Sequence, residues 1–259
     1  MIYEDLTRIR NLKHMVDYAS ENFPERDFIQ YKIPGGIESK TYENLKCDCD
    51  AFSLMLEDKG LCGSHIAVIG PTSYNWIVTY FGTVATESII VPLATSETVE
   101  MNVKLIDFAD VDVLVFDKKS KPLYEAVKEN LPRVKLFVSV DNTSDNDGII
   151  NFCDILNDFS GVYDKEPEAD SVCAIMFTSG TTGFPKGVML THKNLVYSAT
   201  SVHVACPTTK MFCCLPIYHG FCFTANITKS ICRGKTVCVN DSLANLVPDL
   251  RLYKPDSIV

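Results

Sequence analysis

Short apolar strands alternate with amphipathic helical segments between His65 and Val140, and this alternation limits the possible folds more than any other feature of the chain. In chain order we expect strands at 65–69, 88–91, 111–116 and 134–140, separated by helices at about 73–86, 98–108 and 122–131. Parallel strands joined through helices of this length use right-handed crossovers. The sequence therefore predicts an α/β fold with doubly wound, mostly parallel sheets sandwiched by helices.

The first sixty residues predict a smaller arrangement. An apolar stripe indicates a helix over residues 5–20, with Asp5 as its cap. Two short strands flank the turn Pro34–Gly36, and a second helix runs from Thr41 to a stop at Gly60.

An acidic, polar segment containing Pro167 predicts an internal boundary at 162–171. We therefore expect a first α/β subdomain at 1–161 and the start of a second at 172–259. The second is expected to contain helices at 192–205 and up to Arg233, with strands at 211–215 and 236–239. Pro248 leaves 243–250 unassigned. The chain ends within an expected strand, so we expect a second subdomain that is incomplete and a chain that is a fragment.

A buried-strand pattern at 172–177 gives way abruptly to TSGTTGFPKG, residues 178–187. Glycines in such a loop allow successive N–H groups to turn inward and form an anion-binding concavity. Hydroxyl groups add further donors, and one lysine adds a fixed positive charge. The predicted polyphosphate cradle consists of Thr178, Ser179, Gly180, Thr181, Thr182, Gly183 and Lys186.

A Walker A loop is the first alternative, because it also binds phosphates with glycine, lysine and threonine. It requires G-x-x-x-x-G-K-[ST] followed by a helix. Here Gly187 follows Lys186, and Val188–Leu190 predicts a strand. Both the spacing and the next element exclude the Walker A loop.

The string TSGTTGFPKG, followed by a short strand and Thr191-His192, resembles the signature of the adenylate-forming superfamily, which includes acyl-CoA synthetases, luciferases and the adenylation domains of peptide synthetases. The stretch 64–93 resembles that family's early strand, helix and strand, although Thr86-Glu87-Ser88 stands where smaller residues are usual. LPIYHGF, residues 215–221, resembles a second core motif near the carboxylate and acyl pocket. The resemblance thus implies an acyl site at Tyr218, His219 and Gly220.

His219 has a competing structural interpretation, since a histidine after a strand often caps a helix or packs against it. The order Pro216, Tyr218, His219, Gly220 and the expected place at the carboxyl end of a parallel strand favour the pocket.

The resemblance implies a two-step reaction. A carboxylate attacks the α-phosphorus of ATP to give an acyl-adenylate and pyrophosphate, and a thiol such as coenzyme A then displaces AMP. It further implies that the loop binds the β- and γ-phosphates and that the Thr178 hydroxyl is a candidate ligand of Mg²⁺. Family members are about twice this length, and their ribose-binding aspartate and lysine-bearing small domain fall beyond Val259.

Among acyl-activating families, the N-terminal half looks most like the long-chain fatty-acyl-CoA synthetases by general similarity, without a substrate-specific motif, so the resemblance implies a fatty acid as the substrate. An aryl acid or amino acid, as in peptide-synthetase-type adenylation domains, stays open. A non-catalytic nucleotide-binding remnant is an alternative of another class.

The composition limits the partners and the cellular location that can be expected for this chain. The formal net charge of −9, without a dense basic cluster, disfavours a nucleic-acid partner. The chain has eleven cysteines and no apolar signal segment, which indicates a reducing cytoplasm in which most cysteines are core residues. No C-x-x-C spacing occurs, so the cysteines are not expected to bind a metal. The most apolar window, 74–92, divides into a helix and a strand, so no transmembrane span is expected.

Overall fold

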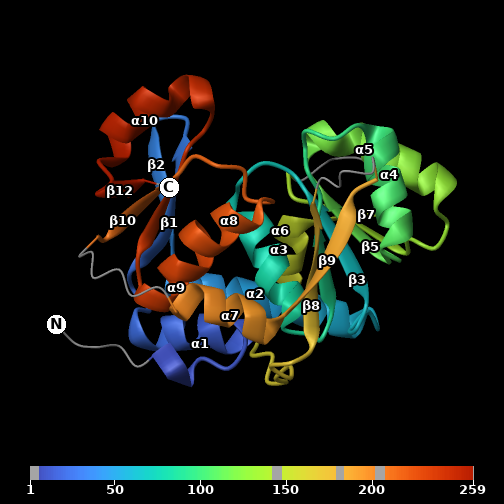
Figure 1. The fold of residues 1–259 in the computed structure, drawn as a ribbon, viewed down its shortest axis with the longest axis horizontal. Helices are drawn as coiled ribbons and strands as arrows, with labels where there is room; N and C mark the ends of the chain where they lie inside the picture. Colours follow the sequence, from blue (N-terminus) through green and yellow to red (C-terminus); the bar gives the residue numbers. More distant parts are fainter. Residues whose placement is uncertain (1–5, 142–147, 179–183, 202–207, 259) are drawn as a thin grey trace. The chain divides into compact units, whose positions relative to one another are not determined.

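The computed structural model describes residues 6–141, 148–178, 184–201 and 208–258 (Figure 1). The chain forms two compact units: a central unit of residues 47–191, and a terminal unit that combines 1–46 with 192–259. This grouping differs from the predicted division at 162–171. The strand that follows that segment pairs with a strand that precedes it, Ile90 with Ala174, so both sides of the expected boundary belong to one sheet.

The central unit contains a seven-stranded sheet in the order β7-β6-β5-β3-β4-β8-β9. Its strands are β3 (His65–Ile69), β4 (Ile89–Pro92), β5 (Val113–Phe116), β6 (Leu136–Ser139), β7 (Ile149–Asn151), β8 (Val172–Thr178) and β9 (Lys186–Thr191). Its helices are α3 (Tyr74–Val84), α4 (Val99–Phe108), η2 (Lys118–Ser120), α5 (Lys121–Asn130) and α6 (Phe152–Asp158). Neighbouring strands are parallel from β7 to β8, and β9 is antiparallel.

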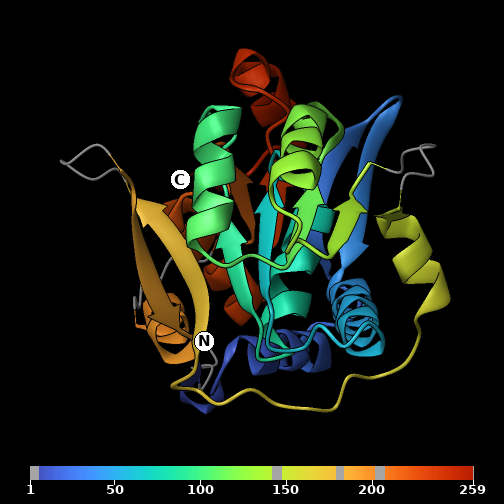
Figure 2. The same ribbon diagram turned by 90° about the vertical axis from the view of Figure 1, so that its right-hand side faces the viewer.

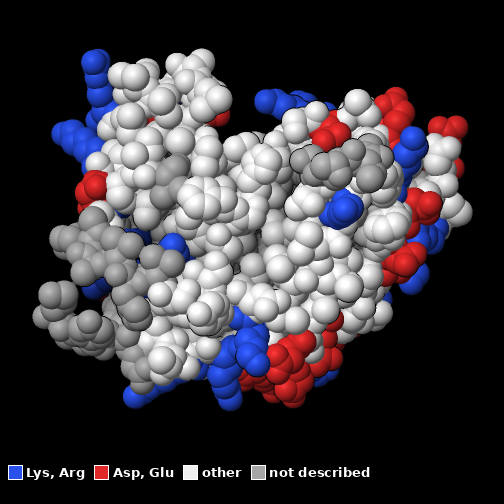
Figure 3. Space-filling view, viewed as in Figure 1, with Lys and Arg blue, Asp and Glu red and all other residues white. Residues whose placement is uncertain are grey.

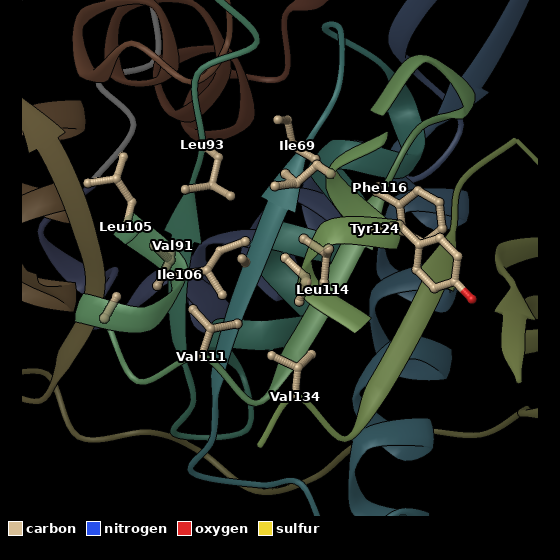
Figure 4. Close-up of a cluster of buried hydrophobic side chains, with 14 residues drawn as sticks. Ile69, Val91, Leu93, Leu105, Ile106, Val111, Leu114, Phe116, Tyr124 and Val134 are labelled. Atoms are coloured by element: carbon tan, nitrogen blue, oxygen red, sulfur yellow. The ribbon is translucent and has the colours of Figure 1, made fainter. Parts of the chain in front are cut away.

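Helices cover both faces of this sheet, α4 and α5 on one and α3 on the other (Figures 1 and 2). Alternation along β3 sends Ala67 and Ile69 into the core beneath α4 and α5, where they join Leu105, Leu114 and other apolar side chains (Figure 4). Burial on both faces explains why these strands are continuously apolar in sequence. The doubly wound, mostly parallel arrangement is the one predicted.

The terminal unit contains a five-stranded sheet in the order β12-β10-β11-β1-β2. Its strands are β1 (Asp27–Ile33), β2 (Gly36–Thr41), β10 (Lys210–Cys213), β11 (Thr236–Val239) and β12 (Ser257–Ile258). Its helices are η1 (Leu6–Arg8), α1 (Leu12–Asn22), α7 (His192–Thr200), α8 (Gly220–Cys222), the π-helical η3 (Phe223–Thr228), α9 (Lys229–Arg233), η4 (Leu243–Asn245) and α10 (Leu246–Tyr253). Helix α2 (Tyr42–Asp58) begins in this unit and continues into the central one.

The helical run from α8 to α9 is held at its far end. Gly234 stops it with φ +60°, and a Cβ there would lie 2.6 Å from the Phe23 ring. The buried Tyr42 hydroxyl lies 2.9 Å from the Ser230 carbonyl oxygen and 2.6 Å from that of Lys235. Burial raises the pKa of Tyr42, which keeps this hydroxyl protonated as a donor. The run therefore ends in a closely packed corner.

Several predicted boundaries are wrong. The first α-helix begins at Leu12, because the Asn11 side chain accepts the His14 N–H and caps it; Asp5 lies outside the described residues. Helix α7 ends at Thr200, and 202–207 lie outside the described residues. The short β7 and α6 were not expected.

Pro248 does not prevent α10, since it occupies the third helical position. The N–H groups of a helix's first turn have no intrahelical acceptor, so proline costs no hydrogen bond there.

Within the described residues, no helix has the length and apolar character needed to cross a bilayer. On the face drawn in Figure 3, the described Lys and Arg side chains are scattered among Asp and Glu.

Candidate nucleotide-binding site

The predicted phosphate loop connects the two strands of a hairpin. Strand β8 pairs with β9 in antiparallel register from Val172–Thr191 to Thr178–Lys186. The loop's first hydroxyl and its lysine are therefore directly opposite each other where the ladder ends. Ser179, Gly180, Thr181, Thr182 and Gly183 lie outside the described residues.

The hairpin opens at a position typical of ligand sites in α/β proteins. Because β8 is parallel to β4, Thr178 lies at the same edge of the sheet as the carboxyl ends of β3 to β6. The chain passes from β3 to β4 on one side and then crosses to β5 on the other. Open α/β sheets bind ligands outside the carboxyl ends of their strands, near such a reversal of direction.

Thr178 and Lys186 are both exposed. Within the part of the chain that the structure describes, no carboxylate forms an ion pair with the Lys186 ammonium group. A lysine with this exposure can bind an anion as a point charge without first giving up a protein partner.

Three aromatic side chains support the second half of the loop. The Phe108 ring from α4 lies 5.5 Å from the Phe184 ring and 6.3 Å from that of Phe177 on β8, measured between centroids. Gly187 allows this approach, since a Cβ there would be 3.0 Å from Ile175 Cγ2 and 3.4 Å from the Phe177 ring. The sequence analysis missed this support, although Phe184 within a polar loop was a signal for it.

His192 follows β9 directly and anchors the next helix. Its Nδ1 accepts the Leu12 N–H at 3.2 Å, and its side chain is buried in the terminal unit. Burial lowers the pKa of His192 to about 4, so the imidazole is neutral near pH 7. His192 therefore has a structural role through its hydrogen bond with the Leu12 N–H, and its position after Thr191 in the sequence did not predict that bond.

The second predicted segment lies in the terminal unit, between β10 and α8. Ile217 is fully buried, whereas His219 is exposed and Tyr218 half-buried, with their rings 4.8 Å apart. The His219 N–H donates to the Pro216 carbonyl, and the His219 backbone forms the N-cap of α8. Its side chain makes no capping hydrogen bond. The capping role is thus confined to the backbone.

Comparison with known proteins identifies the family of this chain. The family model described as AMP-binding enzyme matches residues 16–258. The chain belongs to the AMP-binding enzyme family. The adenylate-forming resemblance predicted from TSGTTGFPKG is thereby confirmed.

The relatives of this chain include acyl-CoA ligases. Long-chain-fatty-acid–CoA ligase 1 of Cavia porcellus is 25% identical over 233 residues, which cover 83% of this chain and 33% of that protein. Long chain acyl-CoA synthetase 1 of Arabidopsis thaliana is 33% identical over 193 residues, covering 67% of this chain and 29% of that protein. The chain spans about a third of the length of these curated relatives.

The fold is also shared with solved structures. The anthranilate CoA ligase AuaEII in complex with anthranoyl-AMP superposes with a TM-score of 0.87 at 17% identity. The superposition covers 96% of this chain and 49% of that one. At this identity the likeness shows the fold alone, which is that of the N-terminal domain of adenylate-forming enzymes.

Proposed function

We propose that this chain takes part in the ATP-dependent activation of a carboxylic acid, forming an acyl-adenylate and then an acyl-CoA. The observation that carries the proposal is the β8–β9 hairpin, which pairs Thr178 with Lys186 at the mouth of the glycine- and hydroxyl-rich loop. Membership of the AMP-binding enzyme family supports ATP as the nucleotide.

In the first step a carboxylate oxygen bonds to the α-phosphorus, and the bond to the bridging oxygen of pyrophosphate breaks. The leaving group carries the growing negative charge. Lys186 and the loop N–H groups stabilise that charge, and the Thr178 hydroxyl donates to a phosphate oxygen. In the second step a CoA thiol attacks the acyl carbon and AMP leaves. We assign Tyr218, His219 and Gly220 to the carboxylate and acyl pocket.

Magnesium would neutralise phosphate charge when bound. Within the described ranges no group of three or more His, Cys, Asp or Glu side chains could hold a metal, and the proposed protein ligand is the Thr178 hydroxyl. A magnesium ion held mainly by substrate phosphates and water fits this donor set, because Mg²⁺ keeps several waters and commonly binds through phosphate oxygens.

We infer a fatty acid as the carboxylate, because the acyl-CoA ligases of Cavia porcellus and Arabidopsis thaliana are named for long-chain substrates. An aryl acid is the second candidate, favoured by the likeness to a ligase in complex with anthranoyl-AMP. A cytoplasmic location and the absence of a nucleic-acid partner stay predictions from composition. The small-molecule partners are those that the family implies.

Carboxylate-dependent exchange of pyrophosphate into ATP tests the proposal, using the longest form of the protein that its gene encodes. We expect exchange with palmitate and formation of palmitoyl-CoA. Exchange with anthranilate alone would assign an aryl acid, and exchange with amino acids alone a peptide-synthetase-type domain. ATP binding without exchange for any carboxylate would leave a nucleotide-binding remnant and contradict the proposal.

The 259-residue chain by itself is a separate test. We expect it to bind ATP weakly and to form no acyl-CoA, since the proposed reaction requires two substrates held in line and the chain covers about a third of the relatives' length. Exchange well above a buffer blank, with contaminating ligase excluded, would contradict this.

A further inference from the structure

Two cysteine sulfurs meet at the ends of the segment that carries Tyr218, His219 and Gly220. Cys213 Sγ lies 3.5 Å from Cys222 Sγ, and the two residues are only 2% and 0% exposed. Cys213 is the last residue of β10, and Cys222 is the last residue of α8. The contact between the two sulfurs therefore brings together the two ends of segment 214–221.

The contacts of the two sulfurs differ. Cys222 Sγ lies 3.2 Å from the Leu215 carbonyl oxygen and 3.7 Å from Asn226 Nδ2, which donates to it. The hydrogen bond between the two cysteines raises the pKa of the Cys213 thiol, as does burial, and it lowers the pKa of Cys222. Cys222 is thus the sulfur that more readily becomes a thiolate, with Cys213 as its neighbouring thiol.

The surroundings favour covalent sulfur chemistry over metal binding. The described residues contain no group of three metal-ligating side chains. Cys222 is followed directly by the π-helical η3, a rare geometry that occurs frequently at functional sites. Leu215 and Phe221, which lie between the two cysteines in sequence, are 36% and 66% exposed.

We propose that Cys213 and Cys222 are a redox pair that a hydroperoxide converts reversibly into a disulfide, closing residues 214–221 into a covalent loop. Because this loop contains the residues assigned to the acyl pocket, any effect of the disulfide on the binding of the carboxylate rests on the proposed function. Formation of the disulfide does not depend on the proposed function.

The reaction balances with one molecule of hydrogen peroxide, the simplest hydroperoxide. The Cys222 thiolate attacks a peroxide oxygen, the O–O bond breaks, and the leaving hydroxide takes a proton to become water, which leaves a sulfenic acid. The Cys213 sulfur then attacks Cys222 Sγ, the S–O bond breaks, and a second water leaves with the Cys213 proton. Two thiols are oxidised by two electrons and the peroxide is reduced.

The geometry requires little movement. A disulfide bond is about 2.05 Å long, so the sulfurs must approach by about 1.5 Å from their present 3.5 Å. Side-chain rotation and a small shift of the segment between them can supply this. Hydrogen peroxide is close to water in size, so a local opening of the partly exposed segment gives it access.

Peptide mapping of the purified 259-residue chain tests the pair. Trypsin releases residues 211–229, which contain Cys213, Cys214 and Cys222. After peroxide and alkylation we expect this peptide to lose two hydrogen atoms and to carry one alkyl group, on Cys214. Dithiothreitol should restore alkylation of all three cysteines.

Four variants assign the bond. Cys214→Ser and the equally buried Cys232→Ala should keep the disulfide, while Cys213→Ser and Cys222→Ser should abolish it. Linkage through Cys214, irreversible sulfinic or sulfonic acid, or three alkylated cysteines in the oxidised wild-type chain would overturn the proposal. The wild-type map decides even where a variant fails to fold.

Native-state proteolysis measures the effect on the loop. Chymotrypsin can cut after Tyr218 and Phe221. Oxidation should slow these cuts by about tenfold, because a closed ring opens less readily, and dithiothreitol should reverse the change. Unchanged cutting despite a mapped disulfide would overturn the claim that the bond restrains the segment. Neither measurement uses catalytic activity, so both stand apart from the test of the proposed function.

Discussion

Two segments of this protein leave the carboxyl end of a parallel strand, yet they are closed by different means. The first, 178–186, is flanked by β8 and β9, whose backbone ladder brings Thr178 opposite Lys186. The second, 213–222, runs from a strand into a helix and is closed by contact between two buried sulfurs. Exposed hydroxyl and ammonium groups mark the first, and the buried Ile217 side chain marks the second.

The difference indicates separate roles. A backbone ladder holds the ends of a loop whatever the loop's side chains are, which leaves those side chains available for an anionic ligand. Where side chains bring the ends of a loop together, the shape of the loop depends on how they pack, and such a loop is suited to recognising an apolar group. Changes in the first segment should therefore alter ligand affinity, and changes around the second should alter stability and substrate shape.

The largest effect is expected where the helical run of the second segment ends. Gly234→Ala places a Cβ 2.6 Å from the Phe23 ring at φ +60°, combining backbone strain with overpacking. We expect a loss of about 3 kcal/mol, measured by urea unfolding. Gly60→Ala is the matched control, with φ +66° and open space around the Cβ, and should cost about 1 kcal/mol. Equal losses would show that the Phe23 contact contributes nothing.

His192, which follows the return strand of the first segment, should make stability depend on pH. Its folded pKa of about 4 is below the ordinary 6.5, so the unfolded chain binds the proton more readily between these values. Stability should fall as pH decreases through this window, by up to about 3 kcal/mol.

Urea unfolding at about pH 7 and about pH 5 measures this dependence. His192→Asn is the control, because its side-chain oxygen can accept the Leu12 N–H without titrating. A wild-type profile no steeper than that of the variant would contradict a buried neutral imidazole.

In the first segment, Lys186→Ala should weaken ATP binding by about 1–3 kcal/mol, or about fivefold to 150-fold, since it removes a charge-assisted contact with the phosphates. Stability should change little because Lys186 is exposed. Calorimetric titration with ATP provides the measurement, and Lys118→Ala is the control at another exposed lysine of the central unit. If Lys186→Ala and Lys118→Ala bound ATP with equal affinity, the assignment of Lys186 to the phosphate site would be wrong.

The smallest effect is expected at His219. In the longest form of the enzyme, His219→Ala should raise the KM for the carboxylate about fivefold and leave the KM for ATP within about twofold. Tyr197→Ala, which removes another exposed ring of the terminal unit, should change neither. An effect on ATP alone, or on thermal stability with unchanged kinetics, would return His219 to its backbone-capping role.

Local patterns predicted much of the fold. Strand β3 at 65–69 and strand β11 at 236–239 were predicted to the residue, because short apolar runs flanked by turn-forming residues specify strands locally. The start of α1 was missed because Asn11 and Asp5 are both plausible caps in sequence, and only the Asn11 contact with the His14 N–H distinguishes them.

The sequence by itself determined the alternation of strands and helices and the loop of glycines, hydroxyls and one lysine, since both depend on residues close together in the chain. Only the tertiary structure decided that β8 joins the central sheet, that His192 accepts the Leu12 N–H, and that Cys213 meets Cys222. These contacts join residues whose separation in sequence carries no periodic signal. They arise because strand pairing and burial are settled by the packing of the whole unit.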